Sequence, residues 1–161
     1  MKKVFALMLC GLCLSLAGCG GGKSASAEAP GAQLANPFVD YATREEAGAA
    51  AGFALSAPDW LDGYDAPTVQ VMNGTMLQLI FRSGDDRLVI RKAAGGEDIS
   101  GDYNSYAETK TAKINGSSVT LRGADGKVSS AVWCAGGYSY AVVSDTPLPS
   151  DVMTDLIAEI S

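Results

Sequence analysis

The chain has 161 residues, with 12 Lys and Arg against 18 Asp and Glu, and its formal net charge is −6. It contains no His, which excludes Ser-His and Cys-His nucleophilic sites as well as His-ligated zinc and haem. The acidic balance argues against a nucleic-acid partner, because phosphate binding depends on Lys and Arg. Three of the four Cys fall within the first 19 residues, so a disulfide within the rest of the chain is excluded.

Residues 1–18 are predicted to be a signal peptide. A short basic start, Met1-Lys2-Lys3, precedes an uncharged apolar run over residues 4–16. This run of about 13 residues is too short for a membrane-spanning helix, which needs roughly 20. Cys10 and Cys13 form a C-x-x-C pair, but in a segment destined for removal we interpret them as ordinary apolar residues.

Leu16-Ala17-Gly18-Cys19 resembles the lipobox of bacterial lipoproteins. The resemblance implies cleavage before Cys19 and attachment of a diacylglycerol to its thiol. Two or more acyl chains hold a protein stably on a membrane without a spanning helix. Cleavage after Gly18 that leaves Cys19 as a free thiol is the alternative. We therefore expect an extracytoplasmic protein anchored to the bacterial cell membrane by lipid on Cys19.

Residues 19–35 are predicted to be a flexible linker, because they are mostly Gly, Ser and Ala with little to bury. Residues 36–161 have the composition of one extracytoplasmic domain. Loss of Lys2 and Lys3 with the signal would leave 10 basic and 18 acidic residues, a net charge of −8. An anionic membrane surface would repel such a domain.

The domain shows helix signals at its two ends and strand signals between them. Thr43-Arg44-Glu45-Glu46 has the pattern of a capping box and predicts a short helix to about Ala51. Ser150 is a candidate cap for a C-terminal helix with an apolar stripe. That stripe consists of Val152, Met153, Leu156, Ile157 and Ile160.

Seven runs of alternating residues are separated by turn signals such as Asn73-Gly74 and Asn115-Gly116. The runs cover residues 68–72, 76–82, 87–93, 109–114, 118–122, 128–134 and 138–143. A polar excursion at 95–106 interrupts them. The predicted fold class is α+β: a single antiparallel sheet of about six or seven strands in a meander, with a short N-terminal helix and an amphipathic C-terminal helix packed on it.

Several segments resemble an uncharacterised bacterial extracytoplasmic domain family that occurs in lipoproteins and in membrane-bound regulators similar to anti-sigma factors. They are PFVDYATREEA at 37–47, RKA at 91–93 with EDISGDY at 97–103, and Trp133 with GGYSY at 136–140. The resemblance covers about residues 37–160. It implies an extracytoplasmic location and assigns no activity or catalytic residue.

Two acidic clusters are candidates for chemistry. Asp98, Asp102 and Asn104, with Ser100, offer oxygen ligands for calcium, but the EF-hand pattern is absent and a solvated loop is the favoured interpretation. The carboxylates of residues 59, 62 and 65 lie beside two aromatic residues and suggest a sugar-binding or glycosidase surface. A chain with 18 acidic residues is expected to contain such clusters by composition alone.

The best candidate for a ligand surface combines aromatic and basic residues on neighbouring strands. The alternatives are that the aromatic residues belong to the core and that the basic residues pair with acids across strands. The candidate residues are Trp133, Tyr138, Tyr140, Arg82 and Arg91; Arg87 and Lys92 belong to the same basic cluster. Cys134, which has no His to activate its thiol, is predicted to be a buried small hydrophobe.

These patterns favour a non-catalytic binding or sensing domain of unknown ligand, which needs no metal or cofactor. Its expected partners are the membrane, through the lipid on Cys19, and a peptide or another envelope protein. The alternatives are a carboxylate-dependent envelope hydrolase and a carrier of lipids or other apolar ligands, which would need a large apolar cavity.

Overall fold

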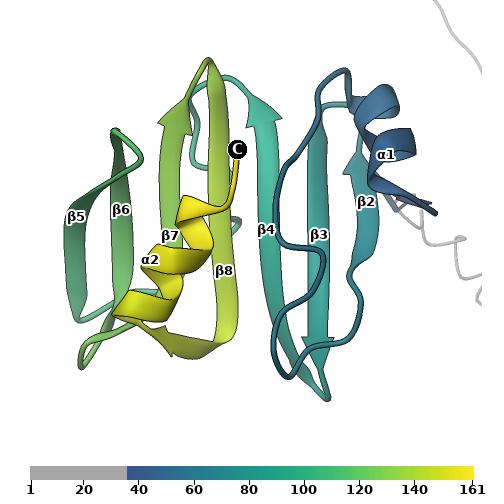
Figure 1. Cartoon of the computed structure of the whole chain (residues 1–161). Coiled ribbons are helices and arrows are strands. Elements are labelled where there is room, and N and C mark those ends of the chain that lie inside the picture. Colours follow the sequence, from purple (N-terminus) through teal and green to yellow (C-terminus); the bar gives the residue numbers. More distant parts are fainter. Residues whose placement is uncertain (1–35) are drawn as a thin grey trace, which may run out of the picture. The chain divides into compact units, whose positions relative to one another are not determined.

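A single antiparallel sheet of eight strands forms the centre of the domain (Figure 1). The computed structural model describes residues 36–161, so the predicted signal peptide, Cys19 and the predicted linker lie outside the described residues. The strands are β1 Phe38–Tyr41, β2 Thr68–Met72, β3 Met76–Ser83, β4 Asp86–Ala94, β5 Glu108–Ile114, β6 Ser117–Ala124, β7 Lys127–Ala135 and β8 Tyr138–Pro149. The helices are α1 Arg44–Ala51 and α2 Ser150–Ala158.

The strand order is β1-β2-β3-β4-β8-β7-β6-β5. The prediction of one antiparallel sheet with two helices is confirmed, but the strands do not form one continuous meander. Two four-stranded meanders join where β4 pairs with β8. The polar excursion is the reason: residues 95–107 carry the chain from β4, in the middle of the sheet, to the edge strand β5.

Two strands differ from the sequence pattern. β1, only four residues long, was not predicted and is held by its pairing with β2. β8 runs past the predicted end at residue 143 to Pro149, and its last residues pair with β7 after a bulge between Val128 and Ser130. Pro147 and Pro149 cannot donate to a ladder, which is why the sequence pattern of this strand stops early.

The predicted turn residues adopt the backbone angles that tight hairpins require. Asn115 and Gly116 have φ values of 49° and 79° and form the two-residue connection between β5 and β6. This left-handed region is one that Asn and Gly tolerate better than other residues. Asn73 also has a positive φ, but it lies in a three-residue connection, 73–75.

The helix ends only partly follow the predicted capping. The Thr43 hydroxyl accepts a hydrogen bond from the backbone N–H of Glu46 at 3.2 Å, as the capping box predicts. The prediction that Ser150 caps the C-terminal helix is wrong: Pro149 is the N-cap, without a side-chain hydrogen bond, and Ser150 is the first helical residue.

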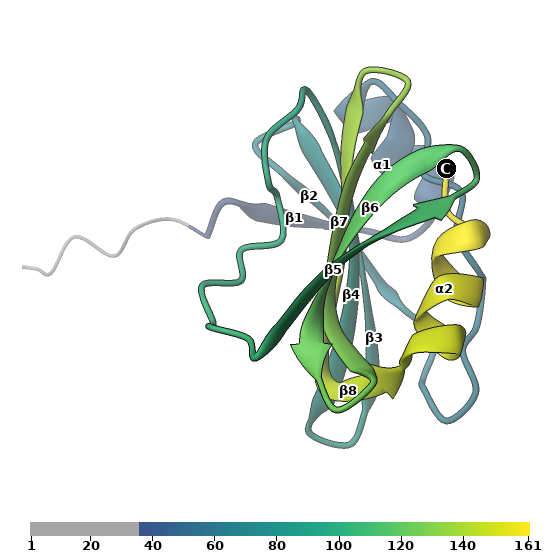
Figure 2. The same cartoon turned by 90° about the vertical axis from the view of Figure 1, so that its left-hand side faces the viewer.

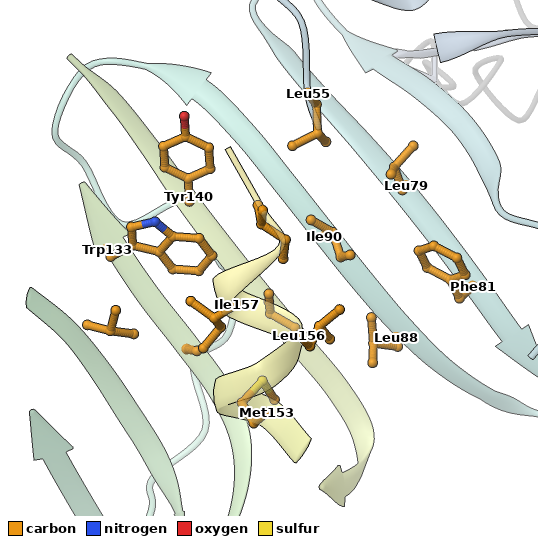
Figure 3. Close-up of a cluster of buried hydrophobic side chains, with 14 of the residues drawn as sticks. Leu55, Leu79, Phe81, Leu88, Ile90, Trp133, Tyr140, Met153, Leu156 and Ile157 are labelled. Carbon is orange, nitrogen blue, oxygen red and sulfur yellow. The ribbon is translucent and has the colours of Figure 1, made fainter. Parts of the chain in front are cut away.

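One face of the sheet, here called the helix face, carries the core. It presents Leu79, Phe81 and Ile90, all fully buried, and both helices lie on this side (Figures 1 and 2). Burial of each such side chain contributes about 2–3 kcal/mol. α2 packs Met153, Leu156 and Ile157 against the sheet (Figure 3), and Ile160, which follows the helix, is buried in the same core. Val152, predicted to join this stripe, is instead 48% exposed.

The opposite face, here called the loop face, is crossed by the connection 95–107, on the side of the sheet away from α2 (Figure 2). Side chains alternate between the faces along each strand, so Gln78 and Arg91 point to the loop face while Leu79 and Ile90 point to the helix face. Within residues 36–161, no helix has the length and apolarity to cross a membrane.

Candidate functional site

Three of the predicted ligand-surface residues, Trp133, Tyr138 and Tyr140, lie on the helix face at one end of β7 and β8. Trp133 and Tyr140 are cross-strand partners, and their rings stack with centroids 5.1 Å apart and planes only 7° from parallel (Figure 3). Phe53, in the segment after α1, packs against Tyr138 with ring centroids 5.2 Å apart.

Lys92 lies within this aromatic group because its strand neighbour is Tyr140. Its ammonium nitrogen Nζ is 4.7 Å from the ring centroid of Tyr138, 5.1 Å from that of Tyr140 and 5.9 Å from that of Phe53. Nζ also donates a hydrogen bond to the carbonyl oxygen of Ala54 at 2.7 Å. The residue is only 7% exposed.

No carboxylate of residues 36–161 forms an ion pair with this ammonium group. Lysines this deeply buried are rare unless an opposite charge accompanies them. The faces of the aromatic rings attract a cation, but they supply no negative charge. Lys92 is therefore a buried positive charge that has no ion-pair partner among residues 36–161.

A pocket of about 430 Å³ opens over Lys92, Tyr138 and Tyr140. Its remaining lining comes from the small residues Ala54, Ser56, Ala135, Gly136 and Ser161, the last residue of the printed sequence, and no Asp or Glu side chain of residues 36–161 lines it. Most of the pocket wall is therefore apolar or aromatic, with one positive charge at its base. This combination suits a small group that joins an anion to an apolar body.

The two arginines of the predicted ligand surface do not join the aromatic residues. Arg82 and Arg91 occupy the loop face. Side chains alternate between the two faces along each strand, and both arginines stand at positions that alternate with Lys92 and its cross-strand partners. The predicted surface therefore separates into an aromatic pocket on one face and arginines on the other. Arg87 forms the predicted kind of cross-strand ion pair, with Asp145 at 3.0 Å.

Arg91 ends a ladder of hydrogen-bonded side chains across four strands. Gln70 donates to Asp40 at 2.6 Å and Gln78 donates to Gln70 at 2.7 Å. Arg91 Nε donates to Gln78 Oε1 at 3.0 Å, and its Nη1 donates to the carbonyl oxygens of Ile99, at 3.2 Å, and Ser100. Burial, together with nearby Arg87, lowers the pKa of the Arg91 guanidinium. Its hydrogen bonds tie the connection 95–107 to the loop face.

The acidic residues of that connection are also engaged locally. Burial acts to raise the pKa of Asp98, but hydrogen bonds from Ser100 and the nearby Arg122 guanidinium outweigh it, so the pKa is lowered. The same balance lowers the pKa of Asp102, which accepts hydrogen bonds from Tyr106 and Asn104. Within residues 36–161, no group of three or more acidic or thiol side chains is placed to hold a metal ion.

The second acidic cluster lies at the surface. Asp59, Asp62 and Asp65 are exposed, and Asp59 pairs with Arg44 at 3.3 Å. A carboxylic acid donates a proton at neutral pH when burial disfavours its charged form. All three side chains of this cluster are exposed instead.

The prediction that Cys134 is buried is wrong, since the structure places it exposed on the loop face. Its strand neighbour Trp133 takes the core-facing position, and alternation turns Cys134 outward. Its Sγ lies 3.7 Å from the Gly96 carbonyl oxygen and 3.7 Å from Ser139 Oγ.

The sequence interpretation missed the role of Lys92. The available signal was the spacing along the strand. Lys92 follows Leu88 and Ile90 at intervals of two residues, so it lies on the same face as these two core residues. The contribution of Phe53 had no local signal. No known protein family, no curated protein and no solved structure matches this chain. The resemblance seen in the sequence therefore stays a prediction.

Proposed function

We propose that this protein is a membrane-anchored, non-catalytic binding protein of the bacterial cell envelope. Lipid on Cys19 would hold it at the membrane, and the domain would bind a small anionic ligand, or the carboxylate end of a peptide, in the pocket over Lys92. The observation that carries the binding role is the buried Lys92 ammonium, which forms no ion pair with a carboxylate of residues 36–161, at the base of an open aromatic pocket.

The chemistry of the pocket supports an anion with an apolar body. The ammonium has one backbone hydrogen bond and retains donors for a ligand oxygen. Tyr138 and Tyr140 offer ring faces for an apolar group. An uncharged ligand of the same shape would leave the positive charge unpaired, so the pocket should bind the anionic ligand more tightly than the uncharged one.

The anchor has its own test. Full-length chain expressed with a labelled fatty acid is expected to carry the label and to sediment with membranes. Cys19→Ser is expected to lose the label and move to the soluble fraction. Labelling that persists in Cys19→Ser would contradict lipidation at this residue.

The binding role is tested with phenylacetate as the probe and benzyl alcohol as its uncharged counterpart. Trp60→Phe leaves Trp133 as the single tryptophan of the full chain, stacked on Tyr140 at the pocket. We expect phenylacetate to change Trp133 emission in a saturable way and benzyl alcohol to have little effect at the same concentration.

Lys92→Met keeps most of the aliphatic volume and removes the charge. It is expected to weaken phenylacetate binding about tenfold or more, whereas the control Lys110→Met, on the exposed edge strand, should not. Ala135→Phe, which fills the pocket but keeps Lys92, should also abolish binding. Equal binding of both probes, or unchanged affinity in a folded Lys92→Met protein, would contradict the proposal.

A further inference from the structure

A second concave surface lies between the segment 56–62 and α2, which lie on the same face of the sheet (Figure 1). It is a groove of about 640 Å³, here called the Trp60 groove. Trp60 is 68% exposed and Val152 is 48% exposed, and both line the groove. Large apolar side chains gathered at an exposed concave surface are typical of sites that bind a partner.

The rim of the Trp60 groove is acidic. Its lining includes Asp59, Asp62, Asp155 and Glu159, and no basic side chain of the described domain lines it. Arg44 lies 3.3 Å from Asp59 but also donates to the carbonyl oxygens of two residues of the groove wall, Ala57 at 2.6 Å and Pro58 at 2.5 Å. Three carboxylates therefore have no ion-pair partner among the described residues.

Two of these acids occupy unfavourable positions for the helix itself. Asp155 is in the last turn of α2 and Glu159 is its C-cap, where the helix dipole is negative and no basic residue compensates. A negative charge there destabilises a helix. The fold alone gives no reason for the acidic groups at this end of the helix, but a cationic partner would.

We propose that the Trp60 groove binds a cationic peptide segment of a partner protein. Its Lys or Arg side chains would pair with the acidic rim, and an apolar or cationic side chain would pack on the Trp60 ring, which attracts both. The acidic rim repels nucleic acids and anionic lipid headgroups, so a protein segment is the occupant that the charges favour. This site has the opposite charge preference to the Lys92 pocket and does not depend on it.

The probes are a fluorescently labelled peptide of alternating Lys and Leu and a matched peptide of alternating Glu and Leu. Fluorescence anisotropy with the full-length chain in detergent is expected to show saturable binding of the Lys-Leu peptide alone, weakened by added salt. Trp60→Ala is expected to weaken this binding about tenfold. In a Trp133→Phe chain, where Trp60 is the single tryptophan, the peptide should shift its emission to shorter wavelength.

Matched charge variants separate the groove from the net charge of the domain. Asp155→Asn/Glu159→Gln is expected to weaken binding about fivefold, and because it removes unfavourable helix charges the protein should stay folded. The control Asp85→Asn/Asp86→Asn removes the same charge at the exposed β3–β4 turn and should change the affinity less than twofold.

Three results would overturn the proposal. Equal weakening by both double variants would indicate non-specific attraction to an acidic protein. Equal binding of the Glu-Leu peptide would indicate an apolar surface without charge selection. A Trp60 emission shift that grows with protein concentration, without peptide, would show that a second copy of the chain fills the groove.

Discussion

Arg91→Met tests whether this arginine holds the connection 95–107 in place. The substitution removes the hydrogen bonds to Gln78 and to the carbonyl oxygens of Ile99 and Ser100, while it keeps an aliphatic chain of similar length. A hydrogen bond from a charged group contributes about 1.5–3 kcal/mol, and partial access of water to the freed acceptors offsets some of the loss. We expect the free energy of unfolding to fall by about 2–4 kcal/mol.

Urea denaturation followed by circular dichroism measures this loss directly. For a domain of this size, it corresponds to a fall in Tm of roughly 10 °C. Chymotrypsin supplies a local readout, because Tyr103 lies in the connection and is 97% exposed. Cleavage after Tyr103 should become faster in Arg91→Met than in the unchanged chain.

Arg82→Met is the matched control, because Arg82 is exposed on the same face and forms no ion pair among the described residues. It should change stability by less than about 0.5 kcal/mol and leave the cleavage rate unchanged. If Arg91→Met behaved like this control in both assays, the reasoning that Arg91 anchors the connection would be refuted.

Three further predictions concern the loop-face side and the β6–β7 hairpin. Gly123→Ala should cost about 3 kcal/mol or more in urea unfolding, because a Cβ there would overlap the carbonyl oxygen of Lys127; a stable variant would contradict the bulged geometry. The lowered pKa of Asp102 means that its carboxylate stabilises the fold above its ordinary pKa of about 3.8, and this contribution is lost as pH falls through the lower folded-state pKa. Asp102→Asn should therefore lose less stability than the unchanged chain between about pH 5 and about pH 2, measured by thermal unfolding. Maleimide should modify Cys134 in the native protein, detected by mass spectrometry of the peptide that contains it; protection until denaturant is added would contradict its exposure.

Local sequence patterns predicted most of the elements, because alternation, caps and tight turns depend on residues close in the chain. Thr43 with Glu46 marked the start of α1, and Asn115-Gly116 marked the β5–β6 turn. The edge strand β1 had no such signal, since four residues carry too little alternation to distinguish a strand. The long β8 was hidden by Pro147, which alternation rules assign to a strand end.

The candidate site was predictable only in part. Trp133, Tyr138 and Tyr140 were recognised as a possible ligand surface because a hairpin must bring them together. Lys92 joins them through the pairing of β4 with β8, two strands separated in sequence by three others. A pattern within one strand fixes which residues share a face, but it does not fix which strand lies alongside.

The sequence by itself determined the acidic, His-free composition and the alternating strands with their turns, and it predicts lipidation at Cys19, because all of these depend on single residues or short segments. Only the tertiary structure decided that Arg91 faces the connection 95–107 while Lys92, one residue on, faces the aromatic pocket. It also brought Trp60 beside α2, nearly a hundred residues later in the chain. Such non-local contacts depend on how whole elements pack, and no local pattern of residues encodes that choice.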